Sequence, residues 1–176
     1  MSIREQFDDD EWFLLGSLPA MIAAAMSTAS PGGAIREMIA GMRGTVEGRR
    51  EHADSELITT LLEKASNWDE ARERATDYRE RTKGRLEEAG ITSRETLLDQ
   101  VVADCGKVAA LIDARCPASE SNAYKIWCVS IARDVAGAAK EGGFLGFGGE
   151  RISDAERATM ARIEGSLGVE AGVLLA

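Results

Sequence analysis

Apolar residues in this sequence return at intervals of three or four positions, and no segment alternates steadily between apolar and polar residues. The clearest example runs through Leu97, Val101, Cys105, Val108 and Ile112. An α-helix turns once in 3.6 residues, so this spacing places the apolar side chains on one helix face, whereas a strand needs a period of two. The sequence therefore predicts an all-α fold, a single-domain bundle of about six or seven helices.

One domain is expected over residues 1–176, with helices at 93–116 and 120–141 in its centre. The apolar content of 44% is that of an ordinary globular protein. A chain of this length buries about two-thirds of its unfolded surface, which is enough for a substantial core. The end segments 1–7 and 169–176 are expected to be flexible.

Two parts of the chain share the order helix, glycine-rich break, helix. They are residues 21–42 and residues 131–163, and their Ala-rich helices are loosely alike in sequence. Such a likeness indicates two similar helical hairpins around an approximate twofold axis. Ala-rich helices also match one another without any duplication, so both explanations stay open at this point.

Helix boundaries are marked by residues that cap helices. The acidic run 8–11 precedes apolar residues and predicts a helix start, because carboxylates stabilise the positive end of a helix dipole. Such a run also supplies calcium ligands, but the alternation and turn glycine of a calcium loop are absent, so capping is favoured. Pro19 either kinks this helix or opens a second one. Asn67 predicts another start, and Ser153 with Glu156 forms a capping box.

A strongly charged segment runs from Trp68 to Leu86, where Tyr78 is the other large apolar residue. Its acids and bases are nearly equal in number and interleaved, so their field largely cancels, and a polyanion-binding face is not favoured. The segment predicts a solvated helix supported partly by ion pairs. Trp12, Trp68 and Trp127 are expected to be core or partly buried anchors.

Composition excludes several classes of function. The net charge of −9 disfavours nucleic acid as a partner. The three cysteines show no CxxC spacing and His52 is the one histidine, so no disulfide framework or metal site is expected and no cofactor is implied. The N-terminus shows no secretory signal, and residues 14–29 are too short and too polar for a predicted membrane span. The expected location is the cytoplasm.

The segment 142–149 combines five glycines with three large apolar side chains. The favoured interpretation is that its phenyl rings fold back and plug one end of the bundle. Two alternatives are docking of these side chains against a partner, a second copy or a membrane interface, and binding of an anion by backbone N–H groups at the following helix start. The candidate site residues of these alternatives are Phe144, Leu145, Phe147, Arg151 and Ser153.

The C-terminal segment resembles a known family. The sequence Gly-Glu-Arg-Ile-Ser-Asp-Ala-Glu at 149–156, followed by Met160, Ile163, Leu167 and Gly168, is similar to the end of a TerB-like (tellurite-resistance type) helical domain, over roughly 35 residues. The resemblance implies an all-helical bundle involved in interaction or stress response. Gly and Glu at 149 and 150 stand where the family has Asp and Gly, so the family's acidic cation site is not expected here.

The residues therefore favour a non-catalytic cytoplasmic helical protein that acts by association, with itself or with another protein. The second hypothesis is a small-ligand or anion binder that uses the loop 142–153 and the helix start after it. The third is an enzyme of unknown class that uses scattered carboxylates or Cys116; it is the least favoured, because a thiol nucleophile needs a nearby base.

Overall fold

The computed structural model describes residues 2–29, 41, 44, 47–138 and 152–169. All of its regular secondary structure in this part of the chain is helical, so the predicted all-α class is confirmed. A 3-10 helix η1 is followed by six α-helices, and residues 47–51 are also helical. The elements are η1 Ile3–Gln6, α1 Asp9–Ala29, α3 Glu56–Leu61, α4 Trp68–Glu88, α5 Arg94–Arg115, α6 Ala118–Ala138 and α7 Asp154–Leu167.

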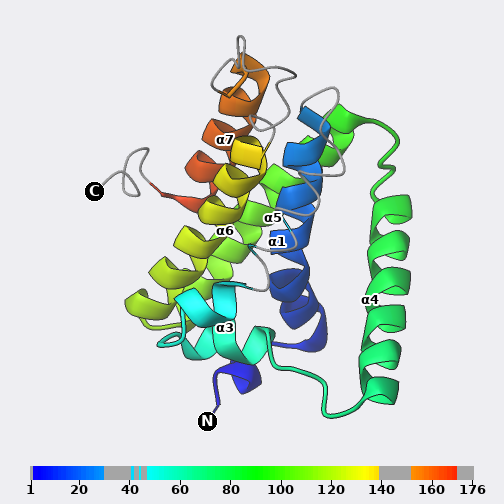
Figure 1. Cartoon of the computed structure of the whole chain (residues 1–176), viewed down its shortest axis with the longest axis vertical. Coiled ribbons are helices and arrows are strands. Elements are labelled where there is room, and N and C mark those ends of the chain that lie inside the picture. The colour runs from blue at the N-terminus through cyan, green and yellow to red at the C-terminus, as the bar shows by residue number, and fades with distance from the viewer. Residues whose placement is uncertain (1, 30–40, 42–43, 45–46, 139–151, 170–176) are drawn as a thin grey trace.

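Four long helices form the bundle: α1, α5, α6 and α7 (Figure 1). Helix α1 contacts the other three, and α5 also packs along α7. The predicted centre at α5 and α6 is therefore shared by α1, whose Leu15, Leu18 and Ile22 are fully buried. The described part of the start of the chain is also anchored, because Ile3 and Phe7 lie in the same core.

Helix α1 continues through Pro19 without a break. A proline has no N–H, so the carbonyl of Leu15, four residues earlier, loses its helical donor. The phenol of Tyr124 on α6 replaces that donor, with 2.6 Å between its Oη and the Leu15 oxygen. Tyr124 is fully buried. Pro19 therefore does not open a second helix: α1 continues through it, and the Leu15 carbonyl accepts its hydrogen bond from α6 instead.

A second close contact joins α6 to the helical residues near position 48. The indole of Trp127 donates to the carbonyl oxygen of Gly44 at 3.1 Å. A Cβ at Gly48 would overlap that indole nitrogen and lie 2.6 Å from Cε2 of the same ring. These glycines, which the sequence marks only as weak helix formers, let the backbone approach a tryptophan that is 1% exposed.

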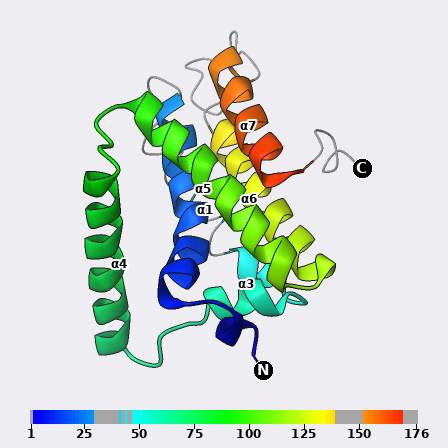
Figure 2. The same cartoon turned by 180° about the vertical axis from the view of Figure 1, so that it is seen from behind.

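Helix α4 lies beside the bundle and apart from it (Figures 1 and 2). Asn67 caps its start by accepting from the Glu70 N–H at 2.9 Å. None of its side chains is fully buried, so the predicted solvated helix is confirmed. Residues 62–67 and 89–93 join it to α3 and α5.

Helix α1 has 21 residues and, by length and composition alone, is the one described helix that suits a membrane span. It begins five residues before the apolar stretch 14–29, which was predicted from the sequence to be too short for a span. In the structure its leucines and isoleucine lie within the bundle. The core helix of a helical bundle has the same length and composition and buries the same kind of side chains.

Both glycine-rich breaks, 30–33 and 142–149, lie outside the described residues. The hypothesis of two similar hairpins therefore stays a prediction. The same holds for the expected flexibility of the last residues, of which only Val169 is described.

Candidate functional site

Of the predicted site residues, Phe144, Leu145, Phe147 and Arg151 lie outside the described residues. Ser153 is described and is the N-cap of α7, as predicted. Its hydroxyl accepts from the Glu156 N–H at 3.2 Å.

The Glu156 carboxylate completes this capping box. It accepts from the Ser153 N–H at 2.6 Å and from the Ser153 hydroxyl at 2.8 Å, and Glu156 is only 3% exposed. The polar atoms of Ser153 are thus engaged in holding the helix start, and a buried carboxyl group already lies there. Ser153, the one candidate residue of the anion site that the structure describes, therefore has no free N–H or O–H for an anion. The anion-binding hypothesis stays a prediction that depends on the remaining residues.

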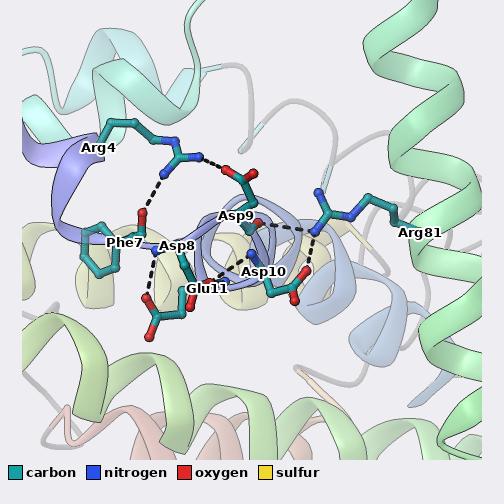
Figure 3. Close-up of polar contacts among 7 residues, drawn as sticks. All are labelled: Arg4, Phe7, Asp8, Asp9, Asp10, Glu11 and Arg81. Carbon is teal, nitrogen blue, oxygen red and sulfur yellow. Dashed lines mark hydrogen bonds and ion pairs between the residues drawn. The ribbon is translucent and has the colours of Figure 1, made fainter.

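The acidic start of α1 is engaged in the same way (Figure 3). Asp8 caps the helix, with its Oδ1 accepting from the N–H groups of Asp10 at 3.0 Å and Glu11 at 2.8 Å. Asp9 pairs with Arg4 before the helix. Capping, the favoured interpretation of this run, is confirmed.

Two arginines from other helices form ion pairs with the acidic start of α1. Arg81 of α4 pairs with Asp10 at 2.8 Å (Figure 3), and Arg115 of α5 binds both oxygens of Glu11, at 2.5 and 2.7 Å. The hydrogen bond from Arg115 is the main reason that the pKa of Glu11 is lowered. No sequence pattern pointed to these partners, because they are about 70 and 100 residues away along the chain.

The three arginines around the start of α1 also lie over aromatic rings. The guanidinium carbon is 5.0 Å from the Trp12 ring centre for Arg4, 4.2 Å from Phe13 for Arg81, and 5.7 Å from Phe7 for Arg115. Such cation–π contacts contribute about 0.5–1 kcal/mol each at exposed sites. The start of α1 is therefore a structural junction between η1, α4 and α5, in which Asp8 caps the helix and the three acids after it pair with arginines.

A few side chains of α4 contact the bundle. The Tyr78 ring packs on Phe13 with 5.6 Å between the ring centres. Arg85 pairs at 2.9 Å with Asp104 of α5, which is 1% exposed. The other oxygen of Asp104 accepts from Gln100 at 2.9 Å, so this buried carboxylate is fully bonded.

Beside these contacts, α4 carries an open apolar groove of about 620 Å³, and Tyr78 belongs to both. It extends along three helical turns and is bordered by charged side chains of both signs, Arg79, Lys83 and Glu87. Its lining residues are Ala75, Tyr78, Arg79, Thr82, Lys83, Leu86, Glu87 and Ile91.

Trp68 lies seven residues before Ala75, two helical turns away and on the same face. It is 82% exposed, the one large apolar side chain in the described ranges with so much contact with water. The expectation that Trp68 is a core or partly buried anchor is therefore wrong. The physical reason is its position: it is the first residue of α4 after the Asn67 cap, at the end of the helix that lies farthest from its junction with α5. Trp127 is buried and Trp12 is half-buried, as expected.

The thiols are poorly suited to nucleophilic catalysis. Burial raises the pKa of Cys105 to about 12 and that of Cys128 well above its ordinary value. Cys116 is half-buried, and its pKa is also raised, first by burial and then by the Glu120 carboxylate. A nucleophilic cysteine needs the opposite shift. Nor do three Cys, His, Asp or Glu side chains come together as metal ligands within the part of the chain that is described.

Compared with models of known protein families, with curated proteins and with solved structures, the chain gives no match. The resemblance to TerB-like domains therefore stays a prediction. The candidate site that the geometry itself offers is the flank of α4 defined by Trp68 and the apolar groove, which we call the outer flank of α4.

Proposed function

We propose that this chain is a non-catalytic helical protein that acts by binding a second protein molecule along the outer flank of α4. The observation that carries the proposal is the 82% exposure of Trp68, which lies two helical turns before the apolar groove on the same face of α4. Contiguous exposed apolar surface marks association sites, and the exposed tryptophan and the groove lie on one helix face. Tryptophan is also among the residues that contribute most to protein interfaces.

The gain from covering Trp68 is substantial. An aromatic side chain buries about 150–250 Å², and about 25 cal/mol for each Å² gives roughly 3–5 kcal/mol when most of the ring is covered. This is an upper estimate, because association also costs translational freedom and side-chain entropy. It is nevertheless comparable to a hot-spot contribution.

The position of α4 supports the same function. The helix contributes no fully buried side chain, so its 21 residues add little to the core. Ion pairs and ring contacts hold one side of the helix to the bundle, and the groove runs beside them, with Tyr78 taking part in both. The TerB-like resemblance of the C-terminal segment implies an interaction role as well.

Site-specific photo-crosslinking tests the proposal. A benzophenone amino acid replaces Trp68 in one variant and Asn122, an exposed residue of α6, in a matched control. We expect one defined adduct from position 68 and none from position 122. The adduct is identified by mass spectrometry as a second copy or a partner, and the complex is rebuilt from purified components and measured by sedimentation velocity. Equal adducts from both positions, or none from either, would refute the proposal.

A further inference from the structure

We infer that α4 is a hinged arm, which opens away from the bundle as one unit while α1, α5, α6 and α7 stay folded. The opening is a property of the chain itself and needs no partner. Three features of the described residues carry it: the narrow contact of α4 with the bundle, the polar nature of that contact, and the bonds that hold α4 together from within.

Helix α4 touches the bundle along a narrow line (Figures 1 and 2). The Tyr78 ring packs on the Phe13 ring, and Leu86, two turns later, packs against the core without being fully buried. A groove lies on each side of this line. One is the groove of about 620 Å³ on the outer flank, and the other, of about 510 Å³, lies between α4 and the start of α1. The arm therefore covers little of the bundle.

Two ion pairs hold this line. Arg81 pairs with the exposed Asp10 at 2.8 Å, and Arg85 pairs with the buried Asp104 at 2.9 Å. When α4 moves away, water reaches the charged groups of both pairs, and their hydration offsets part of the lost attraction. An apolar stripe such as that of α5 gains no comparable hydration when it is separated from its neighbours. Opening of α4 therefore costs less than separation of a bundle helix.

The contact is also loosely packed where α4 lies against α1 and α5. A cavity of about 10 Å³ is found there, and Met21, Thr82 and Asp104 are among its lining residues. The Oγ1 atom of Thr82 is the one buried side-chain polar atom in the described part of the chain that has no hydrogen-bond partner. A buried hydroxyl without a partner is unfavourable, and water supplies the missing bond once the contact opens. The closed position thus carries a cost that the open position does not.

The bonds that stabilise α4 as a helix lie within α4 and its cap. Asn67 caps its start by accepting from the Glu70 N–H, and Glu70 pairs with Arg74 one turn later. Lys83 and Glu87 form a second pair at the same spacing. Pairs four residues apart stabilise a helix without help from a neighbour. These interactions remain when α4 leaves the bundle, so the helix moves as one unit.

Labelling of a thiol beneath α4 tests the inference. Met21 of α1 is buried in this contact, and Met21→Cys in a Cys116→Ser background places a thiol there. Cys105 and Cys128 are buried in the core and report global unfolding in the same molecule. We expect a thiol reagent in excess to label position 21 about tenfold faster or more than Cys105 and Cys128. Mass spectrometry of peptides measures the three rates.

Two arginine variants of this background identify the movement. Arg85→Met leaves the Asp104 carboxylate buried without its guanidinium in the closed position, but exposed to water in the open one. Labelling at position 21 should therefore speed up about tenfold or more. Arg133→Met is the matched control, because it breaks a pair of 3.1 Å with the buried Glu164 between α6 and α7. That pair is the same whether α4 is open or closed, so labelling at position 21 should not change.

Each outcome is decisive. Labelling of position 21 no faster than that of Cys105 and Cys128 overturns the inference, because α4 then separates only when the whole chain unfolds. Fast labelling that Arg85→Met leaves unchanged also overturns it, because position 21 is then accessible without any opening. The labelling uses the chain alone, so its result is separate from that of the cross-linking at position 68.

A second measurement applies if circular dichroism shows that Met21→Cys does not fold. Amide hydrogen exchange is then compared between Arg85→Met and Arg133→Met in the otherwise unmodified chain. Exchange across residues 78–86 should be about tenfold faster or more in the first variant and unchanged in the second. Equal exchange of this segment in both variants overturns the inference.

Discussion

The hydrogen bond between Tyr124 and Leu15 gives the sharpest prediction about the fold. Pro19 removes the N–H that would bond the Leu15 carbonyl, and the Tyr124 hydroxyl takes its place at 2.6 Å. Tyr124→Phe removes the oxygen and keeps the ring, so the variant tests the hydrogen bond with little change in packing. The site is closed to water, since both residues have 0% exposure.

The expected cost follows from that burial. A buried acceptor left without a donor costs about 1–3 kcal/mol. For a protein of 150–250 residues, 1 kcal/mol changes Tm by about 2–4 °C, so a loss of about 2 kcal/mol lowers Tm by about 4–8 °C. The free energy of unfolding is measured by urea titration with tryptophan fluorescence.

The same substitution in a Pro19→Ala background is the control. The alanine of that background supplies an N–H to the Leu15 carbonyl, so Tyr124→Phe should then cost about 0.5–1 kcal/mol, the net value of an ordinary hydrogen bond. The double-mutant cycle should give a coupling energy of about 1 kcal/mol or more between positions 19 and 124. Equal costs in the two backgrounds would refute the explanation that the tyrosine serves the carbonyl freed by the proline.

Three further predictions concern packing, thiol reactivity and pH. Gly48→Ala should lower the free energy of unfolding by about 1–3 kcal/mol because its methyl group overlaps the Trp127 indole. Gly165→Ala, with no described atom within 4 Å of the added methyl group, should raise it by about 0.5–1 kcal/mol. Equal effects of the two substitutions in urea titrations would contradict this prediction. Of the three thiols, only Cys116 should react with a chromogenic disulfide in the folded chain, more slowly than free cysteine, and all three should react in urea; rapid reaction of three thiols without urea would contradict it. The folded pKa of Glu11 is below its ordinary value of 4.5, so its contribution is present above that pH and is lost as the pH falls through the folded pKa; Glu11→Gln should flatten the acid loss of stability, and an unchanged pH profile would contradict it.

Local features of the fold were predictable from the sequence. The caps at Asn67 and Ser153 and the acidic start of α1 depend on residues within one helical turn, and all three are found. The solvated helix α4 follows from its charge pattern in the same way. Short-range hydrogen bonds and helical periodicity act between neighbours, and a sequence displays neighbours directly.

Contacts between residues far apart in the chain could not be predicted from the sequence. Tyr124 bonds a carbonyl 109 residues earlier, and Arg115 reaches Glu11 across 104 residues. The exposure of Trp68 depends equally on where α4 lies relative to the bundle, which no local pattern determines. The candidate site on α4 was missed for this reason, because its apolar residues resemble an ordinary core face until the helix is placed.

Amide hydrogen exchange tests the central claim, association through the outer flank of α4, most directly. The chain is measured alone and in complex with the molecule that is cross-linked at position 68, whether a second copy or a partner. We predict that exchange slows across residues 68–91 and is unchanged in α5, α6 and α7. Slower exchange in those three helices, with α4 unaffected, would contradict the claim.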